Sequence, residues 1–259
     1  MAEHVLERYL HSKLLGTTHT QGWKVVLVGV GGNGSKALIA LKNISLALEA
    51  LGGHGFDVTV FDMDVVSEAN LVRQAFYPSD LGQNKAVTLV NRLNLSCGLR
   101  WTAVPEAFAA KYVQDCDLLV TCVDSGEARA QIAAVAPCAR YWLDFGNASS
   151  FAQAILGQPR RIVERKMKGR LPTVAELLPR ALEADAEADR LPSCSALQAL
   201  ERQDLFVGDA IVTAGMNIVW RLVRHGKIAH HGVFVNLESG VMQPLAVDAK
   251  AWRRLRMAS

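Results

Sequence analysis

Four glycines form the first group of residues in this chain that could do chemistry. Gly29, Gly31, Gly32 and Gly34 fit the pattern GxGxxG and directly follow the apolar run Trp23 to Val28. Glycine allows the tight turn, the close approach of the backbone to a phosphate, and close packing of a helix on a strand. The N–H groups and the positive dipole end of the helix that follows would attract the anion. Because the motif has this strand and helix context, it predicts a nucleotide site.

The polar residues after the next predicted strand indicate which nucleotide is bound. Asp62 ends the stretch DVTVFD, where a dinucleotide site places an acid on the ribose, but it lies further from the glycines than that fingerprint requires. The following stretch holds Asp64, Asn70, Arg73 and Gln74. An arginine and an amide can hold phosphates through charge-assisted hydrogen bonds, whereas a nicotinamide has no evident use for them. The pattern therefore favours ATP, with Asp64 and Gln74 in its site, and a nicotinamide-dependent (NAD) oxidoreductase is the alternative.

These residues together resemble the pattern of a known family. GxGGxG is followed by D-x-D-x-V-x-x-x-N-L-x-R-Q, by Lys85 in LGQNKA, and by Asp124 in CVDSGEAR. The combination is similar to that of the ThiF/MoeB/HesA adenylyltransferases, which are bacterial relatives of the ubiquitin-activating enzymes. The motifs run from about Trp23 to Arg129, and the order of strands and helices extends the resemblance across nearly the whole chain. The resemblance implies an enzyme that uses ATP to convert a carboxylate into an acyl-adenylate.

The resemblance implies a role for each polar residue of the pattern. Asp62 would hold the ribose hydroxyls, and Asp124 would help to bind Mg²⁺. Asn70, Arg73 and Lys85 would contact the triphosphate and offset the charge that grows at the α-phosphate. Cations and a metal suit this reaction because a carboxylate has to approach a polyanion in the transition state. We therefore expect ATP and Mg²⁺ as ligands, with Arg73, Lys85 and Asp124 as catalytic residues.

The resemblance also implies a protein substrate. The family activates the C-terminal Gly-Gly of a small β-grasp protein, either ubiquitin-like or a sulfur carrier, and its members commonly form homodimers. In some members the activated tail then passes to a cysteine thiol. The stretch RLPSCSALQALERQDLFV is similar to the ThiF-family proteins of PRTRC systems, which bacterial mobile elements encode. A non-catalytic platform that binds ATP without activating a carrier is a further alternative.

Three departures from the family pattern limit what carries over. The five cysteines form no CxxC pair, so we expect no zinc. Ser125 replaces the asparagine that often follows the late aspartate. The N-terminal motif R-Y-x-R-Q, which supplies an arginine across family dimers, is only half present in Arg8-Tyr9-Leu10-His11. We expect a surface helix for Arg8 and His11.

Cys194 is placed in a predicted loop, in the turn PSCS after a long crossover segment. Family members with a thioester or persulfide step carry their reactive cysteine in that region, and a helix N-terminus would lower its pKa. Cys194 is therefore a candidate nucleophile, and a structural cysteine is the alternative. Cys116, Cys122 and Cys138 are predicted to be small buried residues near strands.

Composition argues against several other functions. The chain has 259 residues, half of them apolar, and its net charge of +3 is too small to indicate nucleic acid. The basic run Arg160 to Arg170 lacks the aromatic residues of a single-strand binding surface. No apolar run is long enough to span a bilayer, and the first residues do not resemble a signal peptide, so we expect a cytoplasmic protein. The seven histidines show no metal-ligand spacing, and we expect His230 and His231 in a loop.

Strands that alternate with helices must position these residues, and they predict a doubly wound α/β fold with a Rossmann-like, mostly parallel sheet and helices on both faces. The predicted strands cover 23–28, 57–61, 99–104, 116–123, 140–145 and 151–156, and the predicted helices cover 35–51, 81–95, 127–136, 175–188 and 204–224. A closing antiparallel hairpin (232–237 with 241–247) and a peripheral basic tail follow. We interpret the chain as one adenylation domain with an N-terminal arm (1–22), a nucleotide-binding core (23–157), a crossover region (158–203) and a C-terminal helix and hairpin (204–259).

Overall fold

The structure is a computed structural model that describes all residues except 1–6, 10–20, 110–115, 161–169, 184–203 and 259. Its strands are β1 (Arg8–Tyr9), β2 (Lys24–Val28), β3 (Asp57–Phe61), β4 (Thr102–Val104), β5 (Leu118–Thr121), β6 (Tyr141–Asn147), β7 (Phe151–Gly157), β8 (Lys227–Ile228), β9 (His230–Asn236) and β10 (Val241–Ala246). Its α-helices are α2 (Gly32–Ala50), α3 (Lys85–Cys97), α4 (Gly126–Val135), α5 (Val174–Leu177), α7 (Val207–His225) and α8 (Ala249–Ala258). Short 3-10 helices are η2 (Glu68–Asn70), η3 (Pro78–Asp80), η5 (Ala136–Cys138) and η7 (Pro179–Leu182).

The main sheet has the strand order β10-β9-β7-β6-β5-β2-β3-β4. The neighbouring strands β4, β3, β2, β5 and β6 run parallel to one another. Strand β7 runs antiparallel to β6 because only a short turn joins them, and β9 and β10 continue the antiparallel half. The fold confirms the predicted mixed α/β architecture, with a mostly parallel sheet and an antiparallel C-terminal hairpin.

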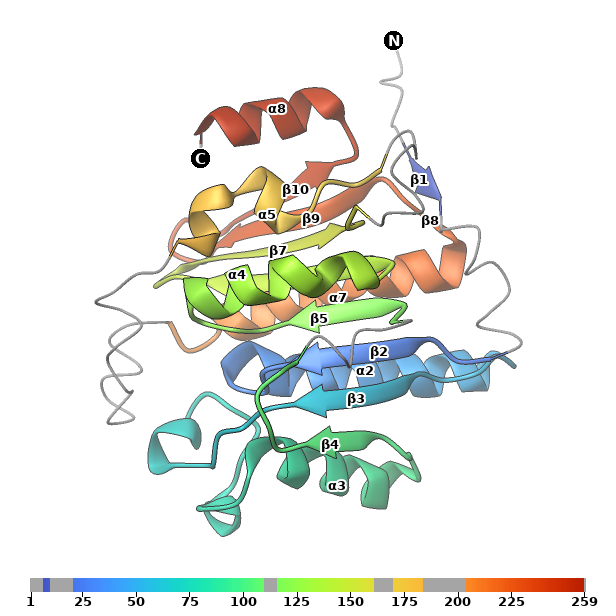
Figure 1. The fold of residues 1–259 in the computed structure, drawn as a ribbon, viewed down its shortest axis with the longest axis vertical. Helices are drawn as coiled ribbons and strands as arrows, with labels where there is room; N and C mark the ends of the chain where they lie inside the picture. The colour runs from blue at the N-terminus through green and yellow to red at the C-terminus, as the bar shows by residue number, and fades with distance from the viewer. Residues whose placement is uncertain (1–6, 10–20, 110–115, 161–169, 184–203, 259) are drawn as a thin grey trace.

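Helices cover both faces of the sheet (Figure 1). Alternate side chains of β2 enter two different cores: Val25 and Leu27 pack in the core that α2, α3 and α7 cover, and Val28 packs in the core that α4 and α5 cover. Strands that are buried on both faces require continuous apolar runs, which explains the sequences KVVLV and LLVT. Trp23 and Trp142 are among the largest fully buried side chains, and each such side chain stabilises the fold by about 2–3 kcal/mol.

The strand order creates one point in the sheet where the winding of the chain reverses. From β2 the chain passes through α2 to β3 on one side, whereas the other neighbour of β2 is β5, which comes later in the chain. Ligands of doubly wound sheets bind beyond the carboxyl ends of the strands at such a point. The glycine loop follows β2 at this edge, and Asp124 follows β5.

Two helix boundaries were predicted well and one was not. Helix α7 ends at His225, one residue beyond the predicted end, and Gly226, with a φ of 70°, terminates it. Helix α3 ends at Cys97, within a few residues of the prediction. The helix expected over 175–188 is shorter in the described part, because α5 ends at Leu177 and Pro179 begins a 3-10 turn. Residues 184–188 lie outside the described residues.

The N-terminal arm contains a strand where we expected a surface helix. Arg8 lies in β1, which pairs antiparallel with β8. The Arg8 Nε donates a hydrogen bond to Gln158 Oε1 at 3.1 Å, and Lys227 forms an ion pair with Glu7 at 3.0 Å. The helix prediction for Arg8 was therefore wrong, because pairing with a distant strand outweighs the weak local preference. His11 lies outside the described residues.

The basic tail, predicted to be peripheral, contains helix α8. His230 and His231 were expected in a loop, but both lie in β9, and His231 is fully buried. Its Nδ1 is 2.8 Å from the Leu156 carbonyl oxygen and must donate to it, so Nε2 accepts the hydrogen bond from Trp252 Nε1, also at 2.8 Å. This chain of bonds attaches α8 to the sheet. The loop prediction for the histidines was wrong because pairing between distant strands places them in the sheet.

Within the described ranges, no helix combines the length and the apolar character that a membrane span requires. The division of the chain into four parts remains a prediction.

We predict that His231 makes the fold less stable in acid. Burial lowers the pKa of His231 from 6.5 to about 4, although the hydrogen bond to Leu156 opposes the shift. Below pH 6.5 the unfolded chain binds a proton that the folded chain does not, so the free energy of unfolding falls as the pH falls towards 4. Measured by urea unfolding, the free energy of unfolding should fall by about 2 kcal/mol from pH 7 to pH 5. His231→Gln should flatten this dependence, the exposed His225→Gln should not, and equal slopes in all three proteins would contradict the prediction.

Candidate functional site

Two glycines of the loop are required by close packing between β2 and β5. Gly29 has a φ of 82°, and a Cβ there would lie 2.9 Å from the carbonyl oxygen of Cys122. A Cβ on Gly34 would lie 1.9 Å from the Gly29 carbonyl oxygen. Any larger residue at Gly34 would therefore push α2 away from the end of β2. These two positions need glycine for the fold itself.

The other two glycines leave the backbone bare. A Cβ on Gly32 would meet no atom within 4 Å, and a Cβ on Gly31 would meet only Gln74 Nε2, at 3.8 Å. Helix α2 begins at Gly32, and its N-cap Gly31 makes no side-chain capping bond. Neither packing nor capping explains these glycines, whereas a phosphate bound at the N–H groups of the first helical turn does.

Asp62 joins the glycine loop to the segment after β3. Its Oδ2 accepts a hydrogen bond from the Val30 N–H at 2.7 Å, and its Oδ1 accepts one from the Asp64 N–H at 2.9 Å. Burial raises the pKa of Asp62, while these two bonds and the charge of Lys85 oppose the shift. The carboxylate thus lies beside the loop, as the sequence pattern requires.

Lys85 lies in the first turn of α3 and points to the same segment. Its Nζ forms an ion pair with Asp64 Oδ2 at 2.9 Å, and its side chain is only 9% exposed, compared with 58% for Asp64. Asn84, which the sequence interpretation did not include, caps α3 by accepting from the Val87 N–H at 3.0 Å. The Asn84 amide also donates to the carbonyl oxygens of Asp62 and Asp64, at 2.9 and 3.1 Å. Asn84 fell inside the helix predicted over 81–95, and the preference of asparagine for the N-cap position was the available signal that the helix begins at Lys85.

A compact turn carries the amide and arginine residues of the pattern. Asn70 is buried, and its Oδ1 accepts hydrogen bonds from the N–H and the hydroxyl of Ser67 at 2.9 and 3.1 Å. The Asn70 carbonyl oxygen accepts from the Gln74 N–H at 3.1 Å. Gln74 Oε1 is buried and has no hydrogen-bond partner in the described part of the chain. Burial lowers the pKa of the Arg73 guanidinium.

Asp124 is exposed in the short connection between β5 and α4, directly before the N-cap residue of α4. Ser125, which stands where many family patterns have asparagine, caps α4 by accepting a hydrogen bond from the Ala128 N–H at 3.1 Å. The substitution therefore keeps the capping function.

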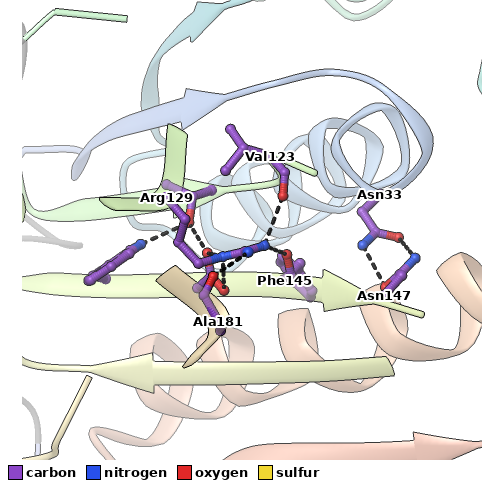
Figure 2. Close-up of polar contacts among 9 residues, drawn as sticks. Asn33, Val123, Arg129, Phe145, Asn147 and Ala181 are labelled. Atoms are coloured by element: carbon purple, nitrogen blue, oxygen red, sulfur yellow. Dashed lines mark hydrogen bonds and ion pairs between the residues drawn. The ribbon is translucent and has the colours of Figure 1, made fainter. Parts of the chain in front are cut away.

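Arg129 holds the backbone next to Asp124. Its guanidinium donates to the Val123 carbonyl oxygen at 2.8 Å and to the Ala181 carbonyl oxygen at 3.1 Å (Figure 2). Its Nε also donates to Asp144 Oδ2 at 3.1 Å. Arg129 thus ties the residue before Asp124 to η7 of the crossover region. The pattern in the sequence gave no indication of this network.

Asp144, the partner of Arg129, is fully buried in β6. It also accepts a hydrogen bond from Thr121 Oγ1 at 2.7 Å, and Thr121 Oγ1 accepts one from Trp142 Nε1 at 2.8 Å. Burial raises the pKa of Asp144, whereas Arg129 and Thr121 oppose the shift. The pair is a structural support that lies beneath the carboxyl edge of the sheet.

A second polar contact joins the glycine loop to the C-terminal half of the chain. The side-chain amides of Asn33 and Asn147 donate to each other's oxygen at 2.8 Å (Figure 2). A Cβ on Gly208 would lie 2.9 Å from Asn33 Oδ1, and Lys36 forms an ion pair with Asp209. The N-termini of α2 and α7 are therefore packed against each other, which the sequence alone did not predict.

The cysteines follow the prediction only in part. Cys116 is buried, and burial raises the pKa of its thiol to about 12. Cys122 is half-buried beneath the glycine loop, and burial raises its pKa well above the usual value. Cys138 is exposed at the end of η5, before β6 begins, so the prediction that it is buried was wrong. Cys194 lies outside the described residues.

Comparisons with known proteins agree with this geometry. The model of the ThiF family matches residues 13–236. A crystal structure of PaaA superposes with a TM-score of 0.61 at 15% identity, over 92% of this chain and 67% of that one. A crystal structure of E. coli MccB with ATP superposes with a TM-score of 0.59 at 17% identity, over 91% of this chain and 66% of that one. The chain thus spans about two thirds of the length of these neighbours, and at such identities the likeness concerns the fold alone. No curated protein matches the chain.

We predict that loss of Arg129 destabilises the fold mainly through the charge that it leaves behind. Arg129→Met should lower the free energy of unfolding by about 3–5 kcal/mol, because Asp144 would remain buried without its cation. Arg129→Met combined with Asp144→Leu should lower the free energy of unfolding less than Arg129→Met alone does. Arg140→Met is the matched control, because it breaks the less buried pair with Asp117, and it should also lower the free energy of unfolding less. Urea unfolding measures all four proteins, and a double variant no more stable than Arg129→Met would contradict the prediction.

Proposed function

The chain belongs to the ThiF family, and from this premise we propose that it uses ATP and Mg²⁺ to adenylate the C-terminal carboxylate of a small ubiquitin-like or sulfur-carrier protein. ThiF-family enzymes use ATP and act as adenylyltransferases on carriers or peptides. The observation that carries the proposal is the bare backbone of Gly31 and Gly32 at the switch point of the sheet, with the Gln74 side chain 3.8 Å from the Cβ position of Gly31. Asp62 and Lys85 border the same edge.

The described residues fit a bound triphosphate. The N–H groups at the start of α2 would hold phosphate oxygens, and the Gln74 side chain, whose buried Oε1 has no hydrogen-bond partner in the described part of the chain, lies beside the Gly31 position. Arg73 would contribute a permanent positive charge. Asp62 would reach the ribose hydroxyls, since a carboxylate that already accepts two N–H bonds keeps lone pairs for further donors. The structural neighbour MccB was crystallised with ATP.

Asp124 is the residue that we propose for Mg²⁺. Among the described residues, no group of three histidine, cysteine or carboxylate side chains could hold a metal ion. A Mg²⁺ ion that binds through one carboxylate, substrate phosphates and water fits this arrangement, because Mg²⁺ usually keeps several waters. When bound, Mg²⁺ supplies positive charge to the phosphate oxygens. Arg129 holds the Val123 carbonyl and so fixes the backbone that carries Asp124.

In the proposed reaction, a carboxylate oxygen of the carrier attacks the α-phosphorus of ATP. The bond from the α-phosphorus to the oxygen that bridges to the β-phosphate breaks, and pyrophosphate leaves with that electron pair. Negative charge develops on the non-bridging α-phosphate oxygens, where the cations of Arg73 and Lys85 would stabilise it. Asp64 holds Lys85 at 2.9 Å, so this cation is positioned before the reaction begins.

Further parts of the proposal rest on the resemblance. A carrier that ends in Gly-Gly, a homodimer, a cytoplasmic location and membership of the PRTRC group are proposed on that basis. Cys194 remains the proposed acceptor thiol, although it lies outside the described residues. Arg8 is bonded to Gln158 of its own chain, so an arginine supplied across a dimer would have to exchange this contact.

We predict that Gly32→Val removes ATP binding and leaves the fold intact. The new side chain meets open space in the protein, so the free energy of unfolding should change by less than about 1 kcal/mol. It would occupy the phosphate position, so ATP–Mg²⁺ should no longer raise the melting temperature. Ala50→Val, at the exposed end of the same helix, is the matched control and should keep the shift.

The same melting experiment separates the alternatives. NAD should raise the melting temperature of the wild-type chain less than ATP–Mg²⁺ does. A larger shift with NAD would favour an oxidoreductase and contradict the proposal.

We predict that Asp124→Ala and Arg73→Ala lower carrier-dependent pyrophosphate–ATP exchange by at least about a hundredfold, because each removes positive charge, directly or through Mg²⁺, from the transition state. A short β-grasp protein ending in Gly-Gly is the carrier to test. Glu127→Ala, on the exposed side of α4 near Asp124, is the control and should exchange normally. Normal exchange in Asp124→Ala and Arg73→Ala would remove the proposed site, whereas ATP binding without any exchange in the wild type would favour a non-catalytic platform.

A further inference from the structure

The turn that carries Arg73 and Gln74 is held by two residues outside the motif that identified the site. Ser35, in α2, accepts a hydrogen bond from the Ala75 N–H at 3.3 Å. Arg92, in α3, donates from Nη1 to the Ala75 carbonyl oxygen at 2.9 Å. Both backbone polar groups of Ala75 are therefore bonded, each to a side chain of a different helix. We call this arrangement the Ala75 clamp.

Arg92 is itself fixed on two further sides. Its Nη2 donates to Asp80 Oδ2 at 2.6 Å, and its guanidinium lies 4.7 Å from the centroid of the Tyr77 ring. Asp80 also accepts a hydrogen bond from the Tyr77 N–H at 2.7 Å. Burial raises the pKa of Asp80, but the bonds from Arg92 and Tyr77 and the charge of Arg92 together outweigh it, so the pKa lies below its usual value. The planar guanidinium thus bonds both ends of one short segment, which a lysine could not do.

The Ala75 clamp sets the position of the turn relative to the glycine loop. Ser35 directly follows Gly34, so its bond to Ala75 joins the two segments. The Gln74 side chain lies 3.8 Å from the Cβ position of Gly31. The clamp therefore defines the gap in which phosphates would lie between the bare backbone and the turn.

We propose that Arg92 and Ser35 are positioning residues, which act on the ATP phosphates through Arg73 and Gln74 without touching the nucleotide. The inference rests on the proposed function, because it gives the turn a phosphate ligand. A small displacement of a positioned cation strongly weakens its contribution, since binding depends on the geometry that is held in advance. Loss of the clamp should therefore weaken binding of phosphates and leave binding of the nucleoside unchanged.

The test measures the affinity of Arg92→Met for ATP–Mg²⁺ and for adenosine by calorimetry. ATP should bind at least about tenfold more weakly than to the wild type, which corresponds to the loss of one well-placed charged contact, and adenosine should bind within about twofold. Arg92→Lys keeps the charge near Asp80 but lacks the second fixed donor, so it should recover part of the affinity. In an Arg73→Ala background, Arg92→Met should weaken ATP binding much less than it does alone, because its effect passes through Arg73.

Arg140→Met is the matched control, because it also breaks an arginine–aspartate pair but at the opposite end of the sheet, and it should bind both ligands normally. If Arg92→Met does not fold, Ser35→Ala gives the same comparison of ATP with adenosine, because it removes only one hydroxyl, which accepts from the Ala75 N–H and donates to the Gly32 carbonyl oxygen at 3.5 Å. Unchanged ATP affinity, or equal loss for ATP and adenosine, would overturn the inference while the proposed function stands. A wild-type chain that binds no ATP would instead overturn the proposed function.

Discussion

The structure depends on one close contact, in which the backbone of the glycine loop passes against the end of β5. A Cβ at Gly29 would lie only 2.9 Å from the Cys122 carbonyl oxygen. The absence of a Cβ at Gly34 allows α2 to pack closely against the Gly29 carbonyl. This contact places the N-terminus of α2 at the switch point of the sheet. Asp62 then bonds the Val30 N–H, so β3 is brought to the same loop. The other candidate residues are positioned relative to these segments.

Much of the fold could be predicted from the sequence because its signals are local. The apolar runs of β2, β3 and β5 and the glycines that follow β2 specify strand, turn and helix without help from distant residues. The candidate site was predictable to the extent that its residues directly follow these strands. The bonds that orient those residues were not, since Asn33 with Asn147 and Arg129 with Asp144 are far apart in the chain. The same reason explains the incorrect predictions for Arg8 and His231, whose partners also come from distant strands and helices.

The polar support of the site follows a common arrangement. Residues one layer further out hold the backbone at or next to the residues that we propose to contact ATP. Asn84 donates to the Asp62 and Asp64 carbonyl oxygens. Arg92 donates to the Ala75 carbonyl oxygen, and Arg129 donates to that of Val123. All four of these bonds come from arginine guanidinium or asparagine amide groups, which can donate to more than one acceptor at once. The proposed site is thus organised by the fold before any ligand binds, which lowers the cost of ordering it during binding.

A crystal structure of the chain with ATP and Mn²⁺, in place of Mg²⁺, tests the central claim most directly. The account predicts phosphate oxygens within hydrogen-bond distance of the N–H groups of Gly31 and Gly32, and Mn²⁺ at Asp124 by its anomalous signal. A nucleotide bound elsewhere on the protein, with the glycine backbone in contact with water alone, would contradict it.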